Sequence, residues 1–78
     1  NPVKKELNVR IRTNVSRDAY SIIISDAAGR TIRNGKYAIT PGNNEIKLQT
    51  DFLSTGMYFL KIFNSNNELI DTEKFLKQ

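Results

Sequence analysis

Asp71 and Glu73 are the only closely spaced pair of carboxylates in this sequence of 78 residues. Two residues apart on a strand, they would share one face, as the acid-base pair of a glycosidase does. We favour a simpler interpretation, in which both acids lie on the wet face of an edge strand. The sequence has no His and no Cys, which excludes Ser-His and Cys-His nucleophiles and zinc sites built on these ligands. We therefore expect no enzymatic activity, no metal site and no cofactor.

Asp26 and Gly29 have the composition of a calcium loop or of a hairpin turn. An EF-hand needs acids at alternate positions over twelve residues, and none follow here. An Asp side chain can instead bind the backbone that follows it, and Gly supplies the positive φ of a hairpin with a bulge. We predict a structural turn formed by Asp26, Gly29 and Arg30, with further turn residues at Gly35 and Gly42.

The net charge of +4 comes entirely from the first 17 residues, which carry a surplus of four positive charges. Arg10 and Arg12 could contact phosphates, and Tyr20 or Tyr58 could stack on bases. We favour a solvated strand face with the tyrosines in the core, because charge runs on strands are usually solvated. We expect no nucleic-acid partner.

The elements that carry these residues are short strands, because apolar residues alternate with polar ones and turn signals recur about every ten residues. The fold class predicted is all-β, a small immunoglobulin-like antiparallel sandwich of about seven strands, with a small open barrel as the alternative. The expected strands span residues 6–13, 19–25, 31–34, 36–40, 45–49, 57–63 and 68–76.

Period-2 alternation also predicts which side chains form the core. In the last strand the inward face is ambiguous, and a bulge near Thr72 would reconcile its two phases. Residues 51–56 are expected to cross between the sheets, with Phe52 and Leu53 closing one end of the core. The predicted core contains Leu7, Val9, Ile11, Tyr20, Ile22, Ile24, Ile46, Leu48, Tyr58, Leu60 and Ile62.

A chain of this length supports one domain with one core, over residues 1–78. It opens with Asn1-Pro2 and has neither an initiator Met nor a signal peptide, so we interpret it as a fragment of a larger secreted protein. Its longest aliphatic run, Ile22 to Ile24, is far short of the roughly 20 apolar residues of a membrane helix. The absence of Cys does not assign a compartment.

Four motifs, in order, resemble the C-terminal sorting domain of the type IX (Por) secretion system of Bacteroidetes. They are Asn1-Pro2 with Leu7-Asn8-Val9, then residues 24–30 (ISDAAGR), residues 53–58 (LSTGMY) and residues 72–77 (TEKFLK). The chain departs from the family at Asn66-Asn67, where glycine is common. The family's opening Asn-Pro is often preceded by an aromatic-Pro, a position that the sequence, which starts at Asn1, does not include.

The resemblance implies a C-terminal secretion signal that directs an attached cargo through an outer-membrane translocon. A sortase-like protease usually removes the domain when the cargo is anchored to the cell surface. It implies export to the periplasm, then to the cell surface or the extracellular space. The sorting-signal residues that it indicates are Gly56, Tyr58, Lys74, Phe75, Leu76 and Lys77, and we expect both lysines on the surface.

An immunoglobulin-like adhesion or carbohydrate-binding module is the alternative function. Such a module would need an exposed aromatic platform. The chain has no Trp, three Tyr and four Phe, and most of these fall in strand phases that we expect to be buried.

Overall fold

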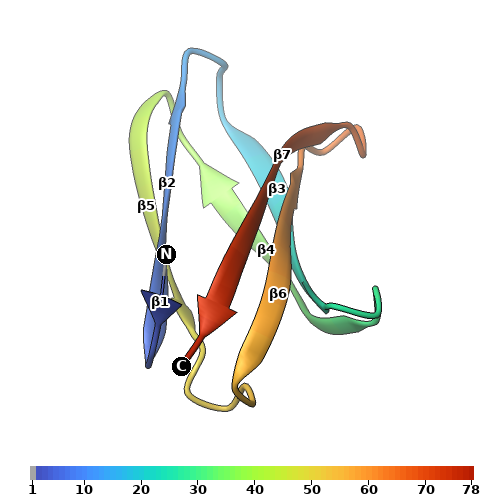
Figure 1. Ribbon diagram of the computed structural model, residues 1–78. Coiled ribbons are helices and arrows are strands. Elements are labelled where there is room, and N and C mark those ends of the chain that lie inside the picture. Colours follow the sequence, from blue (N-terminus) through green and yellow to red (C-terminus); the bar gives the residue numbers. More distant parts are fainter. Residues whose placement is uncertain (1) are drawn as a thin grey trace.

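The computed structural model describes residues 2–78 and is all-β, as predicted (Figure 1). Asn1, the first residue of the opening motif, lies outside the described residues. Six strands of eight or nine residues carry the fold, and a two-residue strand precedes them. The strands are β1 (Pro2–Val3), β2 (Glu6–Thr13), β3 (Asp18–Asp26), β4 (Thr31–Ile39), β5 (Gly42–Gln49), β6 (Gly56–Phe63) and β7 (Leu69–Lys77).

Two sheets of unequal width face each other (Figure 1). The larger has the order β1-β7-β6-β3-β4, and the smaller consists of β2 and β5 alone. The six long strands pair antiparallel, whereas β1 runs parallel to β7. One sheet therefore pairs the second strand with the fifth, and the other carries the third, sixth and seventh as neighbours. This is the arrangement of the B-E and C-F-G strands in an immunoglobulin-type sandwich.

The core lies between the sheets and consists of the inward-facing residues of each strand. Nine of the eleven predicted core residues are buried, and the other two, Leu7 and Ile46, are partly buried against them. Val3, Ile39, Leu53 and Phe75 complete the core. Each fully buried aliphatic or aromatic side chain contributes about 1.5–3 kcal/mol to stability. Burial of the alternating apolar side chains therefore holds the two sheets together.

Residues 31–39 form one strand where the sequence suggested two, and the predicted turn at Gly35 is wrong. β4 pairs with β3 without interruption there, with Ile23 opposite Asn34 and Ile22 opposite Gly35. A Cβ at Gly35 would lie 2.8 Å from the hydroxyl oxygen of Tyr37. The glycine therefore makes room for the Tyr37 ring and does not turn the chain. The sandwich consequently has one long strand fewer than the seven expected.

The bulge predicted near Thr72 is present in β7, at Ile70. Ile62 pairs with Asp71 and Phe63 pairs with Leu69, so Ile70 is the extra residue. The bulge leaves both Leu69 and Ile70 exposed. It also settles the ambiguous phase of the last strand, because from Asp71 onward the odd-numbered residues face the smaller sheet.

After β3 and β4 the chain crosses between the sheets twice more, first at residues 40–41 and second, as predicted, at residues 50–55. At the first crossing the Asn44 side chain accepts a hydrogen bond from the Thr40 amide and donates one to the Thr40 carbonyl. Gly42 follows directly with φ 97° and opens β5, three residues earlier than expected. At the second crossing Leu53 is buried, but Phe52 is 50% exposed under the Arg33 guanidinium and closes no end of the core.

The β3–β4 turn closes on itself through Asp26, as the sequence predicted. The Asp26 amide donates to the Arg30 carbonyl at 2.9 Å, and its Oδ1 accepts bonds from the amides of Ala28 and Arg30. Its Oδ2 accepts a bond from Arg30 Nε at 2.8 Å. Gly29 has φ 88°, in the left-handed region that glycine adopts without strain.

The β6–β7 turn repeats the same arrangement with Asn64 in place of Asp26. Oδ1 of Asn64 accepts bonds from the amides of Asn66 and Glu68, and its Nδ2 donates to Glu68 Oε1 at 2.9 Å. Asn67 takes the place of Gly29 with φ 62°, a conformation that Asn tolerates better than most residues. The Asn66-Asn67 departure from the family pattern therefore preserves the turn.

Protonation of Asp26 should weaken the β3–β4 turn. The Arg30 amide bond first, and the Arg30 guanidinium with it, lower the pKa of Asp26 below 3.8. A group whose pKa falls on folding stabilises the protein above its unfolded pKa, and that contribution is lost as pH falls through the folded pKa. We expect Asp26→Asn to unfold at lower denaturant concentration than wild type at pH 7, and the difference to vanish in strong acid. An NMR titration that placed the Asp26 pKa at or above 3.8 would contradict this account.

Candidate functional site

Tyr58 joins the second crossing to the two C-terminal strands. It is buried at the start of β6, and its hydroxyl donates a hydrogen bond to the Ser54 carbonyl at 2.7 Å. Its ring stacks on Phe75 of β7, with centroids 5.6 Å apart and planes at 21°. A tyrosine that bonds back to the backbone just upstream at this crossing is the tyrosine corner of immunoglobulin-type sandwiches. The Leu-x-x-Gly-x-Tyr motif is thus an architectural element.

Gly56 begins β6 with φ 152°, and apart from Gly56 and its two chain neighbours no residue has an atom within 4 Å of the position that a Cβ would take. Backbone conformation, and not lack of space, therefore favours glycine here, as it does at Gly29. Leu53 fills the core beneath this corner. Thr50 is fully buried, and its amide donates to the Lys5 carbonyl at 2.8 Å, which ties the crossing to the start of β2.

β7 divides the four predicted tail residues between its two faces. Phe75 and Lys77 point inward and are buried, whereas Lys74 is exposed and Leu76 half-buried on the outer face. The prediction that Lys77 lies on the surface is wrong, since alternation from Phe75 places it on the inner face. Its backbone pairs with Val3 of β1, and its Nζ donates to the Gln78 carbonyl at 3.2 Å.

The outer faces of β6 and β7 together form a surface that we call the outer patch, consisting of Met57, Phe59, Lys74 and Leu76. Across the two strands Met57 pairs with Leu76, and Phe59 pairs with Lys74. Met57 and Lys74 are exposed, while Phe59 and Leu76 are half-buried. No strand of the described residues covers this face, because the smaller sheet lies on the opposite side. The patch combines accessible apolar area with a free ammonium group.

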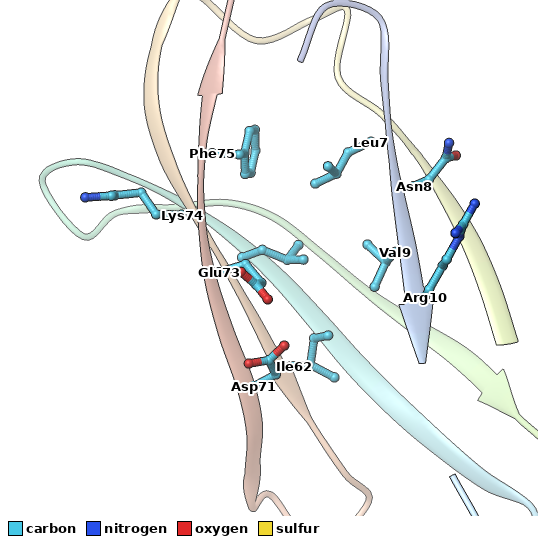
Figure 2. A pocket seen from close by; sticks show the side chains of 10 residues that line it. Leu7, Asn8, Val9, Arg10, Ile62, Asp71, Glu73, Lys74 and Phe75 are labelled. Carbon is cyan, nitrogen blue, oxygen red and sulfur yellow. The ribbon is translucent and has the colours of Figure 1, made fainter. Parts of the chain in front are cut away.

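A cleft of about 210 Å³ lies between β2 and β7 (Figure 2). Leu7 and Val9 line it from β2, and Leu60, Ile62 and Phe75 line it from the larger sheet. It exists because a sheet of two strands does not extend over the inner face of β7.

Asp71 and Glu73 also line this cleft, and Lys74 points away from it (Figure 2). As interpreted from the sequence, the two acids are exposed to water on a strand at the open side of the sheet, but they lie on the same inner face as Phe75. Asp71 Oδ1 accepts a bond from the adjacent Thr72 amide at 2.9 Å. No group of three or more potential metal ligands occurs within residues 2–78.

The basic face of β2 is solvated, as interpreted from the sequence. Arg10 and Arg12 point away from the core, and Arg10 Nε lies 3.4 Å from Glu45 Oε2 on the neighbouring strand. Tyr20 and Tyr58 are buried and present no stacking surface. In residues 2–78 there is also no helix long and apolar enough to cross a membrane.

The sequence reasoning missed two features: the tyrosine corner and the cleft. The signal for the first was available, since a Gly-x-Tyr directly after a crossing of the sheets has this geometry. The cleft depends on the unequal width of the sheets, which arises from long-range pairing that no local pattern encodes.

A family model described as "Secretion system C-terminal sorting domain" matches residues 1–78. No curated protein matches the chain.

Removing the Tyr58 hydroxyl should destabilise the domain while leaving the aromatic stack in place. Tyr58→Phe leaves the Ser54 carbonyl without its partner, and we expect the free energy of unfolding to fall by about 1 kcal/mol. Chemical denaturation measures this, with Tyr37→Phe as the control for loss of a tyrosine hydroxyl elsewhere on the larger sheet. Equal effects of the two substitutions would argue against the corner.

Proposed function

The chain belongs to the family of secretion system C-terminal sorting domains, and from this we propose that its outer patch is the surface read by the outer-membrane type IX translocon. The domain is a C-terminal sorting signal for type IX secretion. The observation that carries this function is the family match over the whole of residues 1–78. It does not favour an adhesion or carbohydrate-binding module.

The division of the tail between two faces supports the outer patch as the recognised surface. Phe75 and Lys77 are buried, so a partner could reach them only after local unfolding. Lys74 and Leu76 are accessible on the folded domain beside Met57. Interfaces commonly centre on apolar side chains that a polar rim surrounds, and the outer patch has this composition. Gly56 and Tyr58 act indirectly, because the corner positions β6 and β7.

A type IX sorting signal implies export of its cargo, followed by secretion or surface attachment. We propose that the cargo first passes through the periplasm, and that a sortase-like protease then removes the domain. We also propose that the domain itself catalyses no reaction, which the absence of His and Cys supports. The domain then contributes only a surface that other proteins recognise.

Charge reversal at one lysine of the outer patch tests the proposal. A reporter fused upstream of Asn1 is expressed in a host competent for type IX secretion, and cell-surface delivery is measured. We expect Lys74→Glu to reduce delivery several-fold. Lys36→Glu is the matched control: it changes the net charge equally and lies exposed on the outer face of the same sheet, on β4.

Melting temperatures separate recognition from folding, since surface substitutions usually change stability by no more than about 0.5 kcal/mol. Lys77→Ala is unsuitable as a probe because its side chain is buried. If Lys74→Glu melts normally and is still delivered like Lys36→Glu, the outer patch is not the recognised surface. If even the wild-type fusion stays in the periplasm, residues 1–78 are insufficient as a signal.

A further inference from the structure

We propose that the residues joining the cargo to Asn1 dock as a strand along the free edge of β7, extending β1 across the mouth of the β2–β7 cleft. The docked strand would shield the junction from proteases. The inference rests on the proposed function insofar as a C-terminal sorting domain carries its cargo on the N-terminal side.

The free edge of β7 is the first observation. On one side β7 pairs with β6 along its whole length, but on the other only Leu76 and Lys77 have a partner, in β1. Within residues 2–78, the backbone groups of residues 69–75 on that side face no strand. An open edge of this kind readily accepts an extended segment through backbone hydrogen bonds.

The register and direction of β1 identify the occupant. Pro2 pairs with Leu76 and Val3 with Lys77 in parallel, so a segment that extended β1 backwards would follow β7 from Phe75 towards Leu69. Continued without a shift, this register places the second residue before Asn1 opposite Glu73. The fourth residue before Asn1 then lies opposite Asp71. A segment that continues β1 would be tethered beside this edge, whereas any other strand would have to arrive from outside.

The lining of the cleft suits such a strand. Paired residues of parallel strands point to the same face, and Val3 and Lys77 both point inward and are buried. The second and fourth residues before Asn1 would therefore point between the sheets, towards Leu7 and Val9. Asp71 and Glu73 would lie beside these two residues. Side chains with an apolar stem and a basic or hydrogen-bonding end would therefore fit best at these positions.

Docking has a consequence for cleavage. Proteases bind their substrates as extended, accessible backbone, and a segment held in a sheet must first detach. The junction would then be cut only when something releases it from β7. Engagement of the neighbouring outer patch on β7 would be one such event.

Disulfide trapping in the complete secreted protein tests the register. A Cys at the second residue before Asn1 is combined with Glu73→Cys, and the bond is identified by peptide mass spectrometry; residues 1–78 contribute no other Cys. Adjacent strands bring Cα atoms within the range that a disulfide spans. We expect oxidation at least tenfold faster than with Asp71→Cys, which lies on the same face two residues away, and than with Arg10→Cys on β2.

Three outcomes would overturn the docking. Faster disulfide formation with Arg10→Cys would place the junction on the edge of β2. Faster formation with Asp71→Cys would show a different register along β7. Equal rates for all three pairs would show that the junction is a free linker. Cell-surface delivery is measured on the same variants before oxidation. If delivery is normal and the trapping rates are equal, the docked strand is rejected and the sorting function stands. If the protein without cysteine substitutions is not delivered to the cell surface, the sorting function alone is rejected.

Limited proteolysis tests the shielding. We expect the oxidised Glu73→Cys pair to be cut at the junction at least tenfold more slowly than the same protein after reduction. Equal rates would show that a docked junction is still accessible and would reject the protection against cleavage.

Discussion

The contact of Tyr58 with Phe75 fixes the rest of the architecture. Through its hydroxyl, Tyr58 holds the end of the second crossing, and through its ring it holds β7 in one register against β6. A shift of one residue would exchange the two faces of β7. Phe75 and Lys77 would then lie outside and Lys74 inside, and β1 would lose its place beside the strand. The same contact therefore determines both the core and the surface that the domain presents.

Local sequence patterns correctly predicted the features that depend on neighbouring residues. They failed for features that depend on pairing between distant segments of the chain. The strand at residues 6–13 and the Asp26 turn followed from alternation and from side-chain hydrogen bonding within five residues. Gly35 was misplaced because its purpose, space for the Tyr37 ring, is visible only once β4 is formed. Lys77 was misassigned because its burial depends on a bulge seven residues earlier and on β1 beside it.

The unequal sheets explain why two carboxylates can occupy inward-facing positions at little cost. With only β2 and β5 in the smaller sheet, the inner face of β7 remains in contact with water, and Asp71 and Glu73 keep their hydration. Charges that point inward from an edge strand also discourage pairing with unrelated chains. The open edge of β7 is therefore more accessible to a segment that is already attached to the domain than to an unrelated chain.

The matching turns at Asp26 and Asn64 bear on the order in which the domain folds. Each is closed by bonds within five residues, so the β3–β4 and β6–β7 hairpins need no distant partner to form. The β2–β5 pair must instead join Thr13 to Gly42 and Glu6 to Gln49. Contacts of long sequence separation slow folding, and we expect the two hairpins to precede the smaller sheet. Kinetic measurements would then find that Asp26→Ala slows folding, whereas Val9→Ala chiefly speeds unfolding. A late smaller sheet would leave the two hairpins for a time with the face later covered by β2 and β5 still in contact with water.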